Sequence, residues 1–320
     1  PIVSTQPSWF YVMVIVTVLL LTELKHTFTE FAQRMKNDEM ITLAKFLAIS
    51  GIILPMLPHK NLIPDINLTP YSIWLATVVV SGISYLSYLL KRYVFHESGV
   101  LVSGIIGGLY SSTATISVLA RKSRKASEQE ANEYVAAMLL AVSMMFLRFM
   151  ILILIFSREI FTSIYPYLLI MSVVAAVVAW FIHSRHRRSK DMADESEDED
   201  SSNPLEFKVA LIFATLFVVF TVLTHYTLVY AGTGGLNLLS FVSGLSDITP
   251  FILNLLQNTG SVAVLVVVAC SMQAIISNIL VNMFYALFFA GKGSKLRPWI
   301  LGGFGTVIGV NLVLLLFFYL

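Results

Sequence analysis

GLYSSTATI at residues 108–116 returns as GLSDITPFI at residues 244–252, and each stretch interrupts an apolar segment with small and hydroxyl residues. Inside a bilayer, no water is present to satisfy the backbone groups that such an interruption frees. It is therefore tolerated only where it is buried in protein or lines a cavity. Two matching interruptions in one chain predict a transport site formed where they meet.

The chain around these stretches has the composition of a polytopic membrane protein. Of its 320 residues, 57% are hydrophobic and 12% are charged. That charged fraction is about half of what a soluble domain carries. The expected fold class is therefore all-α, with the lipid bilayer as the partner and no nucleic acid bound. Cys270 is the single cysteine, which excludes an intramolecular disulfide and a cysteine metal cluster.

Ten apolar segments are long enough to matter in a hydrocarbon core about 30 Å thick. They run over residues 9–24, 40–57, 72–90, 99–119, 134–156, 164–183, 206–229, 235–256, 260–290 and 298–319. The fourth and eighth segments carry the interruptions, so we expect them to be broken, or to re-enter the membrane as hairpins. The long polar insertion between the sixth and seventh segments joins a basic block to an acidic block. It is expected to be a disordered linker.

An internal repeat relates the two halves of the chain at a nearly constant shift along the sequence. Three pairs mark it: Pro70 with Pro204, Gly108 with Gly244, and Arg148 with Asn282. Duplication of this kind is common in transporters. We therefore expect four parts: leading membrane helices over residues 1–69, a first repeat over 70–184, the linker over 185–203 and a second repeat over 204–320.

Lysine and arginine indicate how the segments cross, because they gather on the cytoplasmic side of short loops. If all ten segments cross, nine of these residues fall on one side and ten on the other. If segments 99–119 and 235–256 are hairpins, 17 fall on one side and two on the other. The charges therefore favour hairpins, an inverted second repeat and a cytoplasmic linker at a bacterial inner membrane. The open alternative is a plain bundle in which Gly107 and Gly108 only allow close helix packing.

Polar side chains at membrane depth are the candidate site residues. The interruptions supply six of them: Ser111, Ser112, Thr113, Thr115, Asp247 and Thr249. Asp247 is the candidate metal ligand, because an ionisable group in a membrane is a functional candidate. Its alternative role is to cap a helix by accepting from the amide of Thr249 or of Phe251, the residue after Pro250.

Four further polar residues are expected to support the site: Arg148, Asn254, Asn278 and Asn282. Arg148 lies in the middle of an apolar segment and needs a partner, which is either Asp247 or a bound anion. The three asparagines can serve the site, or they can join helices by hydrogen bonds as packing contacts.

Longer motifs carry a resemblance to a known family. They are GIIGGLYSSTATISVLARK at residues 104–122, MFLR at 145–148, NPLEFK at 203–208, LPMLP at 54–58 and SNILV at 277–281. Over roughly residues 40–290 the chain resembles the C-terminal membrane domain, of unassigned function, that occurs fused to MgtC/SapB-type proteins. That resemblance implies a connection with magnesium homeostasis, and so with metal cations, without naming a substrate.

These features predict a membrane transporter for a small ion, in the first place a divalent metal cation, with a midplane site between inverted repeats. One alternative is an anion transporter or channel that uses Arg148 and the N-termini of half-helices. Another, from a different class, is a regulatory or scaffolding membrane subunit. No enzyme is expected, because the sequence lacks GxxxxGK[ST], HExxH and a nucleophile elbow. No cofactor is expected beyond a transported divalent cation, and a homo-oligomer remains open.

Overall fold

A computed structural model describes residues 14–16, 18, 19, 22, 25, 37–64, 66–95, 99–124, 126, 128–184, 207–257, 262–291 and 296–319. Most of the expected segment 9–24 and the whole expected linker 185–203 lie outside these residues. The chain divides into two compact units, Pro1–Ile52 and Ile53–Leu320. Every element that forms the candidate site belongs to the second unit.

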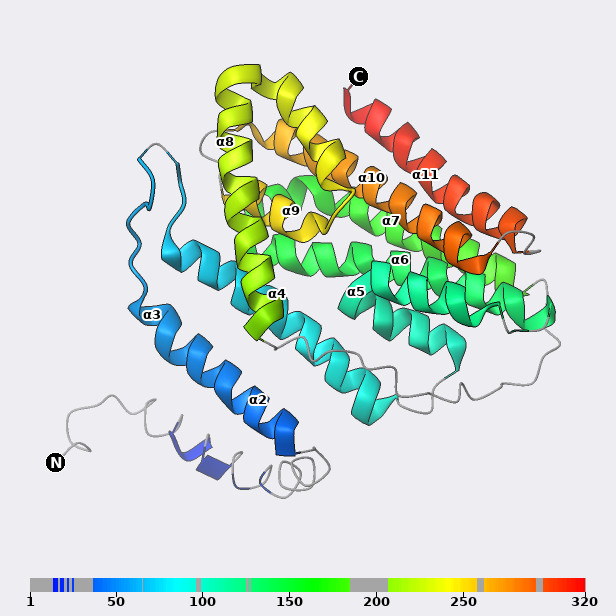
Figure 1. The fold of residues 1–320 in the computed structure, drawn as a ribbon, viewed down its shortest axis with the longest axis horizontal. Helices are drawn as coiled ribbons and strands as arrows, with labels where there is room; N and C mark the ends of the chain where they lie inside the picture. Colours follow the sequence, from blue (N-terminus) through cyan, green and yellow to red (C-terminus); the bar gives the residue numbers. More distant parts are fainter. Residues whose placement is uncertain are drawn as a thin grey trace. The chain divides into compact units, whose positions relative to one another are not determined.

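The described residues form helices and no β-strand (Figure 1). The first unit contains α2 (Asn37–Ala48), which continues into the π-helical turn η2 (Ile49–Ile53). The second contains α3 (Leu54–Met56), α4 (Pro70–Leu89) with the turn η3 (Leu90–Val94), α5 (Val100–Lys122), α6 (Glu128–Phe156), α7 (Arg158–Ser184), α8 (Phe207–Ser243), α9 (Ile248–Gln257), α10 (Val264–Ala290) and α11 (Arg297–Tyr319). Seven described helices are long and apolar enough to cross a membrane. The expected class, an all-α polytopic membrane protein, is confirmed.

Local capping fixes where α4 begins. The Thr69 hydroxyl accepts from the Ser72 amide at 3.0 Å, and the Ser72 hydroxyl accepts from the Thr69 amide at 3.1 Å. Pro70 occupies the first helical position, where the missing N–H would have no helical partner in any case. Helix α4 therefore starts at the proline that precedes the third apolar segment.

Helix α5 folds back on itself. Ser111 has φ −158° and ψ 106°, an extended conformation that divides α5 into two arms, residues 100–110 and 112–122. A Cβ built on Gly107 would lie 2.5 Å from Oγ1 of Thr115. In a straight helix, residues eight positions apart are separated by about 12 Å along the axis. The two arms therefore lie side by side as a hairpin with its tip at Ser111.

Residues 233–257 form a second hairpin. Helix α8 is divided at Gly232, whose φ of +61° is rarely adopted by any residue except glycine. Figure 1 shows the α8 ribbon turning back on itself. A turn at residues 244–247 then leads into α9. Phe220 contacts Phe251 with ring centroids 5.7 Å apart, and Asn254 donates to the Thr224 hydroxyl at 3.2 Å. Helix α9 thus runs parallel to the first part of α8, and the chain between them must reverse twice.

Contacts at the helix ends fix the direction of the second hairpin. The Arg124 guanidinium donates to the Phe288 carbonyl at 3.3 Å, and Arg121 lies 4.4 Å from the centroid of the Phe289 ring. Between these sites the chain passes along α6, α7, the first part of α8, the hairpin and α10. If the hairpin also crossed the membrane, the number of crossings would be odd and the two ends would face opposite sides. If α6, α7, the first part of α8 and α10 each cross the membrane once, residues 233–257 enter and leave on one side.

This arrangement makes a labelling prediction. In a Cys270→Ser background, single cysteines placed at Lys91 and Lys122 are expected to react with an impermeant maleimide added from the same side of the membrane. Both positions flank the first hairpin, so no net crossing separates them. A cysteine at Lys60, which precedes α4 and is exposed, should react only from the other side. Opposite accessibility of the first two positions would contradict the hairpin.

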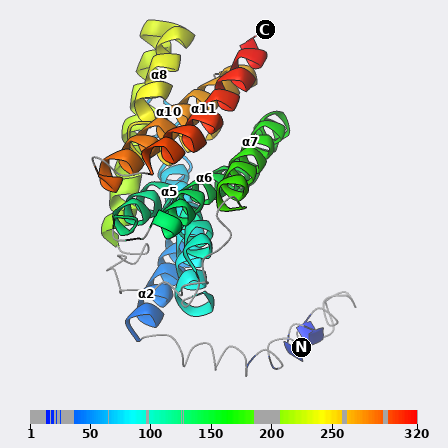
Figure 2. The ribbon, with the colours of Figure 1, turned by 90° about the vertical axis from the view of Figure 1, so that its right-hand side faces the viewer.

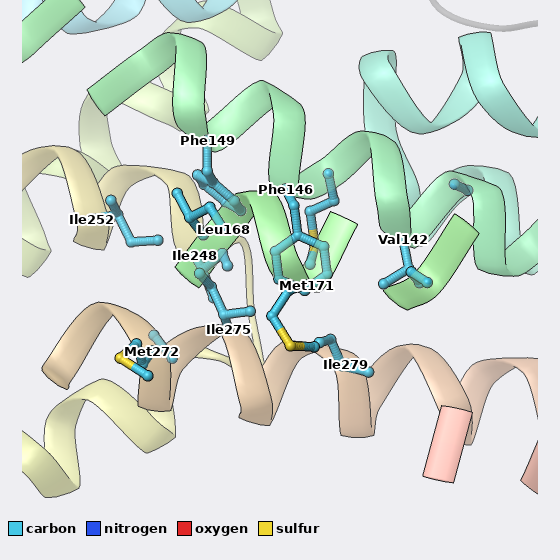
Figure 3. Packing of buried hydrophobic residues seen from close by; sticks show 14 of the residues in the cluster. Val142, Phe146, Phe149, Leu168, Met171, Ile248, Ile252, Met272, Ile275 and Ile279 are labelled. Carbon is cyan, nitrogen blue, oxygen red and sulfur yellow. The ribbon is translucent and has the colours of Figure 1, made fainter. Parts of the chain in front are cut away.

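The buried core joins the two halves of the second unit. Figure 3 shows one cluster of side chains from α6, α7, α9 and α10: Val142, Phe146, Phe149, Leu168, Met171, Ile248, Ile252, Met272, Ile275 and Ile279. Two of these helices precede the expected linker and two follow it. In Figure 2, α10 and α11 run side by side. Large apolar residues such as Trp180 and Phe317 are exposed on the outside, as contact with lipid requires.

Candidate functional site

The two interruptions meet at one cavity of about 490 Å³. Tyr110, Ser111, Ser112 and Thr113 line it from the first hairpin, and Ser246, Asp247 and Thr249 line it from the second. Helices α4, α6, α8 and α10 complete its wall. Of the six candidate residues supplied by the interruptions, the structure thus brings five together: Ser111, Ser112, Thr113, Asp247 and Thr249.

At the first interruption, a helix begins at the cavity. The Ser111 hydroxyl accepts from the amide of Ala114 at 3.3 Å and so caps the second arm of α5. Ser112 and Thr113 are the first residues of that arm and line the cavity. The first amides of a helix have no partner within it, and together they carry roughly half a positive charge. This tip therefore presents a positive helix end with a neutral cap.

Arg148 of α6 reaches the same tip. Its Nη1 donates to the carbonyl of Tyr110 at 2.8 Å. That carbonyl is available because Ser111, the next residue, leaves the helical conformation. The Nε of Arg148 is buried and has no hydrogen-bond partner among the described residues. Arg148 therefore stabilises the interruption and still has an unsatisfied donor beside the cavity that it lines.

At the second interruption, Asp247 caps α9. Its Oδ1 accepts from the amide of Thr249 at 2.9 Å, which is the capping role that the sequence left open. The side chain remains exposed at the cavity wall, and its second oxygen has no hydrogen-bond partner in the described part of the chain. Asn278 of α10 supports this turn, because its Nδ2 donates to the carbonyls of Gly244 and Ser246 at 3.4 Å each.

Arg148 and Asp247 do not form the ion pair that was one expectation for them. No nitrogen–oxygen contact within 4.0 Å joins these two described residues, although the Asp247 charge acts on the Arg148 guanidinium. Each side chain is held at its own interruption, Arg148 by the carbonyl of Tyr110 and Asp247 by the amide of Thr249. Two opposite charges therefore stand on one cavity wall without neutralising each other directly.

Equivalent positions perform the same structural tasks in the two hairpins. Ser111 and Asp247 occupy matching places in the two copies of the repeat, and each caps the arm that follows its interruption. Tyr110 and Ser246, the residues before them, also match. The carbonyl of each accepts a side-chain hydrogen bond from a helix that follows its hairpin. The backbone of the two tips is thus stabilised in the same way.

The glycines that allow close helix packing also lie at equivalent positions of the two repeats. A Cβ on Gly108 would lie 2.5 Å from the Cα of Ala141 in α6. One on Gly244 would collide with the Cβ of Ser277 in α10. The shift that relates Gly108 to Gly244 also relates Ala141 to Ser277. Each hairpin therefore relies on a glycine at the same position to approach the next long helix closely.

Three candidate residues lie away from the cavity wall. Thr115 lies against Gly107, where the two arms of α5 meet. Asn254 is fully buried in α9 and donates to Thr224. Asn282, expected to align with Arg148, donates to Asn278 at 3.2 Å, and its own Oδ1 is buried without a partner among the described residues. In this structure, Asn278 rather than Asn282 performs the carbonyl contact that Arg148 performs in the first half.

Sequence analysis missed five polar residues of the wall, two of which, Tyr110 and Ser246, are next in sequence to residues that it named. Ser81 and Ser84 of α4 and Tyr285 of α10 line the cavity. The two serines are three positions apart and therefore share one face of α4, which is a signal that the sequence contains. Tyr285 gives no such signal, because aromatic residues are frequent throughout this chain.

Comparison with known proteins gives a family and no activity. A family model described as a domain of unknown function, DUF4010, matches residues 78–290. An uncharacterized protein of Aquifex aeolicus (strain VF5) is 27% identical over 221 residues, which cover 68% of this chain and 94% of the relative. No solved structure matches. The match agrees with the expected membrane domain of unassigned function, while the connection with MgtC/SapB-type proteins stays a prediction.

Proposed function

Because the chain belongs to the DUF4010 family, whose description names no activity, we propose a function from its cavity: transport of a small solute that carries an anionic group. The observation that carries this proposal is the Arg148 guanidinium, which lines a cavity that two helix N-termini also reach and forms no ion pair with Asp247. Guanidinium groups bind carboxylates and phosphates by paired hydrogen bonds. Helix N-termini bind the same groups through their amides.

The fixed charges around the cavity also favour an anionic group. Arg148 contributes one positive charge, and the two helix N-termini contribute roughly half a charge each. Asp247 contributes one negative charge, which offsets the helix end that it caps. The sum is positive by roughly one charge, and it is concentrated at the first interruption.

A divalent metal cation is the second candidate. In its favour, Asp247 has a free carboxylate oxygen at the cavity, which Thr113 and Thr249 also line. Against it, hard cations such as Ca²⁺ take about six to eight oxygen ligands, often from several carboxylates. Within the described residues, no group of three histidine, cysteine, aspartate or glutamate side chains could hold a metal. The positive charge of Arg148 lies on the same wall and would repel the ion.

Alternating access through inverted repeats is part of the proposal. Asn67, which precedes α4, donates to the carbonyl of Gln257 at the end of α9 at 3.3 Å. Helix α4 separates Asn67 from the start of the first hairpin, so the two hairpins would enter from opposite sides. The constant shift between equivalent positions of the two hairpins supports duplication. With the lysine and arginine distribution, we assign the end of α5 and the linker 185–203 to the cytoplasmic side of a bacterial inner membrane.

Uptake into liposomes tests the proposal. We expect purified protein to accumulate at least one of lactate, alanine and phosphate in exchange for the same unlabelled solute, and to leave Mg²⁺ and Mn²⁺ outside. Empty liposomes serve as the control. Uptake of Mg²⁺ or Mn²⁺ that disappears in Asp247→Asn would instead support the metal cation. Absence of all uptake by folded protein would support the regulatory or scaffolding alternative.

A further inference from the structure

The first and second interruptions carry different charges at the cavity, although their positions in the repeat are equivalent. The cap of the first arm is neutral in Ser111, whereas the cap of α9 is negative in Asp247. The carbonyl of Tyr110 is held by the cation of Arg148, whereas that of Ser246 is held by the neutral amide of Asn278. The first interruption is therefore a positive pole and the second a negative pole.

Each pole has bonding capacity that the protein leaves unused. Within the described residues, the Arg148 guanidinium has no carboxylate partner, and the second carboxylate oxygen of Asp247 has no hydrogen-bond partner. Opposite charges attract strongly where little water is present, so unpaired charges on one cavity wall are unfavourable. The contacts of Arg148 with α5 and of Asp247 with α9 keep the two charges more than 4.0 Å apart. A ligand with one charge of each sign would satisfy both.

We propose that the transported solute is a small zwitterion of the amino-acid class, with its carboxylate at Arg148 and its ammonium at Asp247. This inference rests on the proposed transport function and names its substrate class. The cavity of about 490 Å³ is in the range of small-ligand sites. Val80, Met145 and Phe213 also line it, so an uncharged side chain is the one that fits.

The competing interpretation is that Asp247 binds a coupled cation, while a simple anion binds at Arg148. A bound sodium ion would need several oxygens around the carboxylate. The Asp247 side chain is exposed to the cavity rather than enclosed by oxygens. This exposure favours an ammonium group that arrives with the solute.

Matched pairs of probes test the inference, because each hydroxy acid differs from its amino acid only in having a hydroxyl in place of the ammonium. The pairs are glycine with glycolate, alanine with lactate, and leucine with 2-hydroxyisocaproate. Binding of each labelled probe is measured on the purified full chain. We expect at least one amino acid to bind about tenfold more tightly than its hydroxy acid, since hydrogen bonds to charged groups contribute about this factor or more. Asp247→Asn should remove that preference, by weakening amino-acid binding about tenfold relative to hydroxy-acid binding. Asparagine still caps a helix, so folding is retained.

Different failures separate the two proposals. Hydroxy acids that bind as tightly as their amino acids would overturn the zwitterion and leave transport of an anionic solute in place. Amino-acid binding that survives in Asp247→Asn would overturn the assigned role of Asp247. Absence of binding by all six probes would also overturn the inference, whereas phosphate uptake in the liposome assay would still uphold the proposed function.

Discussion

Replacing Arg148 by glutamine is expected to weaken solute binding by roughly 30- to 1000-fold. Removing one partner of a buried, hydrogen-bonded charge pair costs about 2–4 kcal/mol. Glutamine lacks the charge and is shorter than arginine, so it cannot hold the carbonyl of Tyr110 and a solute carboxylate at once. Equilibrium binding of labelled solute to the purified variant measures the loss, and uptake into liposomes should fall with it.

Two further variants serve as comparisons for Arg148→Gln. Arg148→Lys keeps the charge but replaces the planar fork with a single ammonium, so we expect binding between that of the glutamine variant and the native chain. Arg158→Gln removes an exposed arginine at the start of α7, away from the cavity wall, and should bind solute normally. If Arg148→Gln binds as the native chain does, the arginine only stabilises the hairpin and the proposed site is wrong.

Substituting alanine for Gly108 is expected to destabilise the protein by about 1–3 kcal/mol, as overpacking of a buried contact usually does. The new Cβ would lie 2.5 Å from the Cα and 2.7 Å from the carbonyl oxygen of Ala141. Both are backbone atoms of α6, so no side chain can rotate away to make room. The hairpin would have to move off α6, and the carbonyl of Tyr110 would move with it.

Gly302→Ala is the matched control, because Gly302 lies within α11 and no atom lies within 4 Å of its added Cβ. There, alanine should leave stability unchanged, or raise it by up to about 1 kcal/mol through its higher helix propensity. Thermal unfolding in one detergent, followed by circular dichroism, compares the variants with the native chain. Equal unfolding temperatures for the two variants would show that close approach at Gly108 does not hold the hairpin in place.

Two kinds of sequence signal located the hairpins, and each has a physical basis. Small and hydroxyl residues within an apolar segment mark the places where a membrane helix cannot continue, and Ser111 and Asp247 lie at those places. The lysine and arginine distribution predicted the topology independently of these motifs. The end of α5 does lie beside the end of α10, through Arg124 and Phe288. The expected gap between segments 206–229 and 235–256 corresponds to the bend at Gly232.

The interactions within the site could not be predicted in the same way. Pairing Arg148 with Asp247 was reasonable from charge alone, but backbone groups at each tip compete for these side chains. Such competition depends on the conformation of the interruption, which composition does not specify. The position of Asn254 away from the cavity wall has a related reason, because its hydrogen-bond partner Thr224 lies in the part of α8 that precedes the bend at Gly232.

The short arms of the hairpins have an electrical consequence. Residues 100–110 extend over roughly 16 Å at 1.5 Å per residue, about half of the hydrocarbon thickness. A solute at the tips would therefore sit near the middle of the voltage drop across the membrane. A voltage of 100 mV does about 2.3 kcal/mol of work on each unit charge that crosses it. A solute with balanced charges would experience no net force from that voltage. Its own concentration gradient would therefore set the direction of net transport.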